Sequence, residues 1–221
     1  MNARFTDREG AGRLLAREVA AVLDGPDAAP GDAAPVVLAL PRGGVPVAAP
    51  VAAELGAPLD VLVVRKLGQP GRPELGLGAL AEDGAPIWND ALLRDLGLTP
   101  GDLADVVPRE AAELRRRVAR YRGDRPAEPV VGRSVVVVDD GLATGLTALA
   151  AVANVRSRGA ARVVLAVPVA AASTARWLRS AADDVVCLLA PRRLRSVGEW
   201  YDDFTQVPDE AVLALLGGRP G

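Results

Sequence analysis

The sequence predicts an α/β fold with a doubly wound, mainly parallel sheet, and three observations support this prediction. Short continuous apolar runs that end at Gly, Pro or charged residues are typical of strands buried on both faces. Stretches with helical spacing separate these runs, as the crossovers between parallel strands require. The chain has 221 residues, of which 50% are hydrophobic, enough for a sizeable core. We therefore expect a single domain over residues 1–221.

The first segment, residues 1–34, predicts a helix followed by a linker. Apolar residues over 6–23 recur at helical spacing, and Thr6 and Glu9 fit a capping box at the start of this helix. Gly, Pro, Asp and Ala then dominate up to Pro35, a composition typical of connections between elements.

Five apolar runs predict the strands of the sheet. They are residues 36–40, 59–64, 134–138, 163–169 and 184–189. Helices are expected at 45–56, 145–158, 173–182 and 208–216. Because ligands of such folds bind beyond the carboxyl ends of the strands, the residues that follow these runs are the candidates for a site.

Three other segments interrupt or follow this pattern. Residues 66–78 are rich in Gly and Pro, which predicts a loop without regular structure. A hairpin is expected around Asp83 and Gly84. Residues 89–130 predict a helical insertion, and residues 191–221 predict a C-terminal hood or tail.

The inventory of reactive side chains is narrow. The chain has no histidine, one lysine (Lys66) and one cysteine (Cys187), which excludes a Ser-His-Asp triad, a Cys-His pair, His-ligated zinc and an intrachain disulfide. A net charge of −2 argues against broad nucleic-acid binding. The sequence contains neither an apolar leader nor an uninterrupted apolar span, so we expect a cytoplasmic protein with no membrane contact.

The most informative segment is VVVVDDGLATGLT, residues 135–147. A buried strand ends in two carboxylates, Asp139 and Asp140, and a glycine-containing loop then enters a helix. Such a loop turns N–H groups inward, and a helix N-terminus adds partial positive charge, so together they suit a phosphate monoester. The carboxylates suit hydroxyl groups or a hydrated Mg²⁺. This pattern indicates a ribose 5-phosphate site; the alternative is an ordinary strand-to-helix turn with an Asp cap.

Two basic motifs follow neighbouring strands. Arg42, Gly43 and Gly44 come after the first strand and offer a cation and closely approachable amides. The alternative for them is a simple strand-to-helix turn. Arg65 and Lys66 end the second strand, where they can face an anionic ligand or form a solvated basic pair.

Together these motifs closely resemble the type I phosphoribosyltransferases over residues 36–206. The combination LPRGG, VVRK and GEWYDDF also resembles a branch of predicted bacterial members whose acceptor is not settled. The resemblance implies phosphoribosyl pyrophosphate (PRPP) as co-substrate and Mg²⁺ as cofactor. Asp139 and Asp140 would bind the ribose 2- and 3-hydroxyls, and the metal through water or PRPP. The loop around the 5-phosphate would consist of Gly141, Ala143, Thr144, Gly145, Leu146 and Thr147.

The resemblance also implies roles around the pyrophosphate. Arg42, Gly43 and Gly44 would form the pyrophosphate loop, with a non-proline cis peptide between Pro41 and Arg42. Arg65 and Lys66 would face the leaving group, and residues 66–78 would be a flexible lid. Of the nearby carboxylates, Glu74 is a candidate for handling a proton of the acceptor, as is Glu82; the alternative for both is a solvated acid.

The acceptor is predicted from the aromatic tail. Trp200 and Tyr201 are candidates to stack on a nucleobase, and the alternative is a packing cluster or a dimer contact. Ala143 stands where the hypoxanthine–guanine enzymes have an aspartate, and in this it resembles the adenine or orotate branches. A purine, and hence purine salvage, is the first expectation; a pyrimidine, or an amine or hydroxyl outside the nucleobases, stays open.

We thus expect a Mg²⁺-dependent transfer of the 5-phosphoribosyl group from PRPP to a nitrogen acceptor, by a homodimer typical of the family. The alternative is a PRPP- or nucleotide-sensing regulator on the same fold. For that alternative, the arginine-rich stretch 115–125 could contact RNA or an acidic partner. A solvated helix face is the other explanation, because Glu110 and Glu113 precede it at helical pairing distances.

Overall fold

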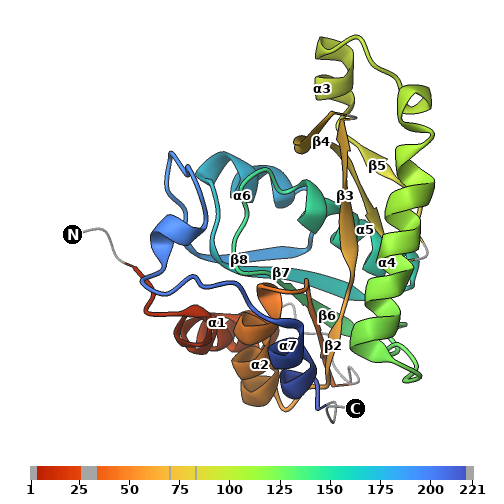
Figure 1. Ribbon diagram of the computed structural model, residues 1–221. Coiled ribbons are helices and arrows are strands. Elements are labelled where there is room, and N and C mark those ends of the chain that lie inside the picture. Colours follow the sequence, from red (N-terminus) through yellow and green to blue (C-terminus); the bar gives the residue numbers. More distant parts are fainter. Residues whose placement is uncertain (1–3, 26–33, 70, 83, 218–221) are drawn as a thin grey trace.

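The central sheet is parallel, as the apolar runs predicted (Figure 1). The computed structural model describes residues 4–25, 34–69, 71–82 and 84–217. The strands of this sheet are β1 (Val36–Ala39), β2 (Leu59–Val61), β6 (Ser134–Val138), β7 (Arg162–Val169) and β8 (Asp184–Leu189). Their order is β2-β1-β6-β7-β8, and each neighbouring pair is parallel. The chain winds outward in both directions from β1 and β6, so these two strands form the topological switch point of a doubly wound fold.

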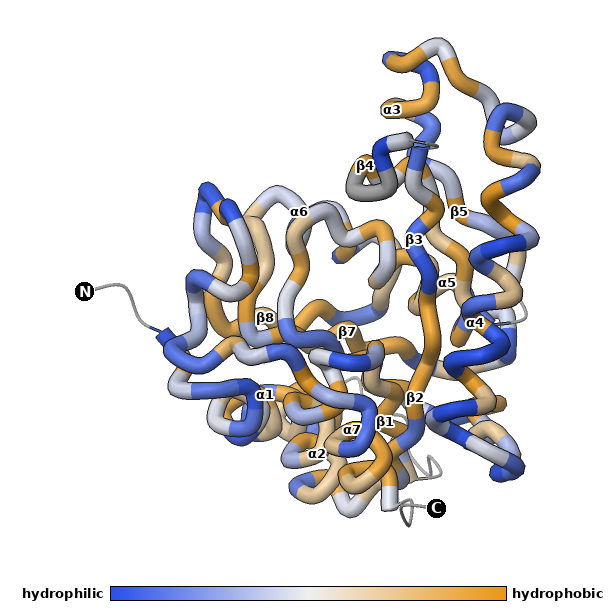
Figure 2. The backbone as a smooth tube through the Cα atoms, viewed as in Figure 1, coloured by the Kyte–Doolittle hydropathy of each residue, from blue (hydrophilic) through white to orange (hydrophobic). Residues whose placement is uncertain are grey.

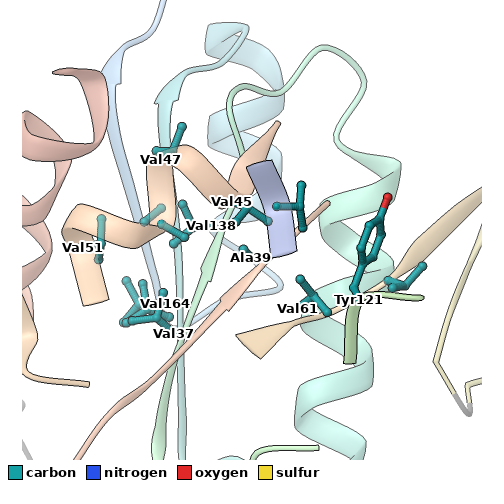
Figure 3. Packing of buried hydrophobic residues seen from close by; sticks show 14 of the residues in the cluster. Val37, Ala39, Val45, Val47, Val51, Val61, Tyr121, Val138 and Val164 are labelled. Carbon is teal, nitrogen blue, oxygen red and sulfur yellow. The ribbon is translucent and has the colours of Figure 1, made fainter. Parts of the chain in front are cut away.

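Helices cover both faces of this sheet. They are α1 (Arg8–Leu23) and α2 (Gly44–Leu55) on one face, and α5 (Leu146–Ser157) and α6 (Ala172–Leu178) on the other. Successive strand residues alternate between the two layers: Val37 and Val138 pack with α2, whereas Val137 packs with α5. Figure 3 shows the first of these layers, with Val45 and Val51 of α2 beside the strand residues. Burial on both faces explains why these strands are continuous apolar runs.

The segment 66–78 is not the irregular loop that its Gly and Pro content predicted. It belongs to a second sheet of antiparallel strands β3 (Val64–Gln69), β4 (Arg72–Ala81) and β5 (Ile87–Trp88), in the order β3-β4-β5. Two register shifts, between Leu67 and Gln69, accommodate the glycines. Arg65 and Lys66 therefore lie inside a strand of this second sheet and do not end a strand of the first. The hairpin expected around Asp83 and Gly84 is also present, because β4 pairs with β5. Asp83 itself lies outside the described residues.

The insertion 89–130 is helical, as expected. It contains α3 (Asp90–Asp95), the 3₁₀ helix η1 (Pro100–Leu103) and α4 (Val106–Arg122). Figure 2 shows hydrophobic and hydrophilic residues alternating along α4, whose apolar side chains join the core of the α2 layer. In Figure 1 this helix stands beside β3, away from α1 and α2. None of the helices in the described ranges is long and apolar enough to cross a membrane.

A buried ion network fixes α4 to the sheets. Arg122 at its C-terminal end donates from Nε to Asp60 at 3.1 Å, from Nη1 to Glu82 at 2.7 Å and from Nη2 to the carbonyl of Val61 at 2.7 Å. Both acids are buried, and Glu82 also accepts from the amide of Val63. Glu82 is therefore not a solvated acid, nor a candidate for proton transfer; it holds the insertion in place.

The N-terminal segment and the aromatic tail meet near the switch point. The cap of α1 is Asp7, whose side chain accepts from the amide of Gly10, and not the predicted Thr6. Phe5, just before it, forms an isolated bridge with Tyr201, beyond the 3₁₀ helix η2 (Gly198–Trp200). The chain then ends in α7 (Asp209–Leu215), which packs on α2 and α4.

Candidate functional site

The loop after β1 and the loop after β6 are in close contact at the switch point. The peptide bond between Pro41 and Arg42 is cis, as the resemblance implied. Gly43 and Gly44, which follow, lie against the acidic pair. A Cβ at Gly43 would be 2.0 Å from Oδ2 of Asp140, and a Cβ at Gly44 would be 3.1 Å from Cα of Asp139. These contacts leave no room for a side chain, which explains both glycines. The structure thus brings the predicted pyrophosphate loop and the predicted ribose carboxylates together.

The predicted phosphate loop, residues 143–147, is exposed at its first two residues and buried where α5 begins. Gly145 adopts a left-handed conformation (φ 79°) and caps α5 without a side-chain hydrogen bond. Ala143 and Thr144 are exposed, while the carbonyl of Ala143 accepts from Thr174 at 2.7 Å. The positive end of α5 therefore begins at an accessible loop, an arrangement that suits a phosphate.

The two carboxylates strongly affect one another. Burial first, and the negative charge of Asp140 second, raise the pKa of Asp139 well above its ordinary range, while Lys66 and Arg8 act in the opposite direction. Burial also raises the pKa of Asp140, which Arg8 counteracts. The side chain of Asp140 is 16% exposed. Such a half-buried acidic pair with a cation on either side is typical of a binding site.

Arg8 is a site residue that the sequence did not reveal. Its Nε donates to Oδ2 of Asp140 at 2.9 Å. The residue lies in the first turn of α1, more than a hundred positions away, in a segment without a recognisable motif. A pattern read along the chain carries no signal for this contact, because it depends on α1 packing across α2.

A cavity of about 780 Å³ opens beside the acidic pair. Asp139 and Thr147 lie at one part of it, β3 contributes Arg65, Lys66 and Gln69, and the insertion forms the opposite wall. The insertion residues that line it are Asp102, Asp105, Val106, Arg109, Glu110 and Arg117. Its volume is in the range of small-molecule sites. The insertion, to which the sequence assigned no role, is therefore part of the site.

The predicted cations differ in their availability. Lys66 is exposed, lines the cavity and contacts no carboxylate within 4.0 Å in the described part of the chain. Arg65 instead donates from Nη2 to Glu110 at 2.7 Å and from Nε to the same oxygen at 3.0 Å. Arg42 lies 3.7 Å from Asp209 of α7. Of these three cations, Lys66 is the one that has no carboxylate within 4.0 Å among the described residues, so it can meet an anion without first leaving a partner.

The aromatic tail does not face the cavity. The ring of Tyr201 is 3% exposed and packs between Phe5 and Phe204, with centroid distances of 5.3 and 5.1 Å. Tyr201 therefore cannot stack on a nucleobase, which corrects that prediction in favour of a packing cluster. Trp200 is half-buried against the same cluster and does not line the cavity either.

Glu74, the predicted acid of the lid, belongs to β4, but its side chain lies outside what the structure describes.

The arginine-rich stretch 115–125 is largely paired. Arg116 and Arg117 donate to Glu113, Arg120 lies against Asp209 and Glu210, and Arg122 belongs to the buried network. The pairing expected for Glu113 is confirmed, whereas Glu110 binds Arg65 of β3 and Arg122 is buried.

The model of the phosphoribosyl transferase domain family matches residues 13–200. The chain belongs to the phosphoribosyltransferase family. The match covers most of the chain, including both loops of the switch point and the insertion. Arg8 and Tyr201, which contact Asp140, lie just outside it.

Relatives of this phosphoribosyltransferase domain are found in bacteria. A Mycobacterium tuberculosis protein, provisionally named a phosphoribosyl transferase in strains CDC 1551 and H37Rv, is 47% identical over 212 residues. These residues are 96% of this chain but 46% of the relative, so the chain spans about half the length of the curated relatives it matches.

Solved structures support the fold. The protein TT1426 from Thermus thermophilus is 45% identical, with a TM-score of 0.79 over 96% of this chain and 97% of that one. AQ2163 from Aquifex aeolicus has a TM-score of 0.53 at 12% identity, over 86% and 78% of the two chains, and so resembles this domain in fold alone.

Proposed function

We propose that this domain catalyses a Mg²⁺-dependent transfer of the 5-phosphoribosyl group from PRPP to a nitrogen acceptor. The observation that supports it best is the close contact between the loops after β1 and β6 at the switch point. There an acidic pair, the N-terminus of α5 and the backbone of Gly43 and Gly44 lie close to the exposed Lys66. This arrangement offers one subsite for each part of PRPP.

In this proposal the 5-phosphate binds the loop 143–147, and its negative charge is met by the amides and the start of α5. The ribose 2- and 3-hydroxyls donate to Asp139 and Asp140. The pyrophosphate lies over Gly43 and Gly44 and against Lys66, with Arg42 and Arg65 drawn from their carboxylate partners when the ligand binds.

Mg²⁺ fits these residues as a cofactor shared with the ligand. In the described residues no group of three or more acidic, His or Cys side chains could hold a metal. Mg²⁺ prefers one or two carboxylates together with phosphate and water oxygens, which Asp139, Asp140 and PRPP would supply. When bound, the ion would neutralise charge on the pyrophosphate.

The chemistry is a substitution at the anomeric carbon. The bond from that carbon to the pyrophosphate oxygen breaks, its electron pair leaves with the oxygen, and an oxocarbenium-like centre remains. A nitrogen lone pair of the acceptor forms the new bond from the opposite face, and the acceptor's proton passes to a base or to water. The domain contributes positioning and fixed positive charge at the leaving group, so no histidine is needed.

The acceptor would enter the cavity between β3 and α4, and the β3–β4 hairpin would act as the lid over it. A purine remains the first acceptor to test. None of the described residues that line this cavity is aromatic, so recognition there would rest on hydrogen bonds and charge.

The test is pyrophosphate release from PRPP in the presence of Mg²⁺ and a panel of purines, pyrimidines and small amines. We expect release with at least one acceptor, and none from a variant with Asp139→Asn and Asp140→Asn. Binding of PRPP without turnover on any acceptor would instead support a PRPP-sensing regulator. If PRPP does not bind, both functions are wrong.

A further inference from the structure

We propose that Arg8 is a positioning residue for Asp140, and that the N-terminal segment and the aromatic tail form a clamp on this residue. The clamp consists of Phe5, Arg8, Tyr201, Phe204 and Thr205. The inference rests on the proposed function in one respect, because it takes Asp140 as an acceptor for a ribose hydroxyl. It adds that the N-terminal segment and the aromatic tail support ribose binding. The sequence had predicted contact with a nucleobase for the aromatic tail and no role for the N-terminal segment.

The Arg8 guanidinium is held from three sides. Its Nε donates to Oδ2 of Asp140 at 2.9 Å, and its Nη1 donates to the carbonyl of Thr205 at 2.8 Å. Its Cζ lies 3.8 Å from the centroid of the Phe204 ring, a cation–π contact. The side chain is only 11% exposed. A planar guanidinium fixed at three points presents its donor to Asp140 in one orientation.

This contact determines which carboxylate oxygen a ligand can reach. Oδ2 of Asp140 is occupied by Arg8 and lies against Gly43, where a Cβ would be 2.0 Å away. Within the described ranges, the hydrogen bond and ion pair that another residue makes with the Asp140 carboxylate are to Oδ2. Oδ1 is therefore the oxygen left to accept from a ribose hydroxyl, and Arg8 prevents the carboxylate from rotating away.

The tail holds the same residue by its backbone. The hydroxyl of Tyr201 donates to the carbonyl of Asp140 at 2.6 Å. Phe5 and Phe204 flank the Tyr201 ring. Backbone hydrogen bonds join Phe5 to Trp200 and Asp202, and Thr6 to Asp203. Side chain and main chain of Asp140 are thus restrained by two segments that are also bonded to each other.

A merely structural clamp would behave differently from a positioning one. Loss of a purely structural contact lowers the free energy of unfolding and leaves the folded site unchanged. Loss of a positioning contact weakens binding of ligands that use Asp140 and spares those that do not. Two probes separate these cases: ribose 5-phosphate, which has the diol, and metal-free inorganic pyrophosphate, which has neither the diol nor the Mg²⁺ that Asp140 would help to hold.

The experiment is calorimetric titration of the full chain with both probes, well below its unfolding temperature. We expect Arg8→Gln to weaken ribose 5-phosphate at least tenfold and to change pyrophosphate affinity less than twofold. Arg8→Lys keeps the positive charge but loses the planar set of guanidinium donors, so it should weaken ribose 5-phosphate binding to an intermediate extent. In an Asp140→Asn background, Arg8→Gln should add less than a twofold loss, because both changes remove the same interaction.

The matched control is Arg13→Gln, on the same helix, where Arg13 pairs with exposed Glu9 and with no other carboxylate among the described residues. It should leave both affinities unchanged. Equal weakening of both probes by Arg8→Gln, no weakening of either, or full additivity with Asp140→Asn would overturn the inference. If Arg8→Gln does not fold, Tyr201→Phe removes a single hydroxyl and should weaken ribose 5-phosphate alone; unchanged binding would again overturn it. Failure of the unaltered chain to bind PRPP or ribose 5-phosphate would instead overturn the proposed function.

Discussion

Gly43 is the residue on which the two loops of the site meet, because the carboxylate of Asp140 occupies the space of its missing side chain. We expect Gly43→Ala to displace this carboxylate and to weaken ribose 5-phosphate binding at least tenfold. Titration calorimetry measures the loss. Gly101→Ala is the control, since its Cβ would meet nothing closer than 3.4 Å. Normal affinity in Gly43→Ala would show that the carboxylate tolerates displacement.

The acidic pair predicts an unusual pH dependence. Because burial and Asp140 raise the pKa of Asp139, its ionised form is lost on acidification at a pH above its ordinary value of 3.8. Ribose 5-phosphate binding should therefore decline in that higher range as the pH falls. Asp140→Asn removes the like charge and lowers the pKa of Asp139, which should move the decline to lower pH.

Affinities of the unaltered chain and Asp140→Asn are compared at each pH, so that titration of the ligand itself affects both equally. If the affinity for ribose 5-phosphate declines at the same pH in both proteins, the charge of Asp140 does not raise the pKa of Asp139.

At the scale of elements, the Arg122 network anchors α4 to β2 and β4. Arg122→Met would leave two buried carboxylates without their cation, and we expect the free energy of unfolding to fall by about 3–5 kcal/mol. Denaturant unfolding followed by circular dichroism measures this loss. The control is Arg116→Met on the same helix, whose pair with Glu113 is solvent-exposed and should contribute little. Equal stability of the two variants would show that the network is dispensable.

The contact between α4 and β3 predicts a gain of affinity. Glu110 competes with an anionic ligand for Arg65, which it holds at 2.7 Å. Glu110→Gln keeps the shape of the side chain but weakens this hold, so pyrophosphate with Mg²⁺ should bind several-fold more tightly. Calorimetry with pyrophosphate tests this, and Glu9→Gln, whose partner Arg13 lies on α1 and does not line the cavity, serves as the control. Weaker binding in Glu110→Gln would mean that Arg65 must be positioned by Glu110 to meet the ligand.

For the whole molecule, PRPP should stabilise the fold, because its subsites come from segments far apart in the chain. At a concentration of about 100 times the dissociation constant, a ligand that binds only the folded state adds about 2.7 kcal/mol. Thermal unfolding with PRPP and Mg²⁺ should therefore occur about 5–10 °C higher. The combined Asp139→Asn and Asp140→Asn variant should show no such shift, and a full shift in it would place PRPP elsewhere.

The local pattern of hydrophobic residues was sufficient to predict much of the fold. The valine run of β6 is buried on both faces, and its continuous hydrophobicity indicated this directly. The Gly- and Pro-rich segment around Lys66 was misjudged, because composition describes the intrinsic preference of the backbone. Pairing with β4, packing of Leu67 in the core and two register shifts overrode that preference.

The aromatic tail was ambiguous for a related reason. Three aromatic residues in five positions favour either stacking on a ligand or packing together, and the sequence does not distinguish them. Contact with Phe5, at the other end of the chain, decided for packing. Glu82 was equally open, since an acid at the end of a strand looks solvated until Arg122 is placed beside it.

By itself, the sequence determined the parallel sheet, the two loops at its switch point and the acidic pair followed by the predicted phosphate loop. Each of these is local, because a few consecutive residues carry both the conformation and the chemistry. Only the tertiary structure decided that Arg8 and Tyr201 hold Asp140, that α4 lines the cavity and that Arg65 is paired while Lys66 has no carboxylate partner among the described residues. Those features are contacts between distant segments, and their geometry exists only once the core has brought the segments together.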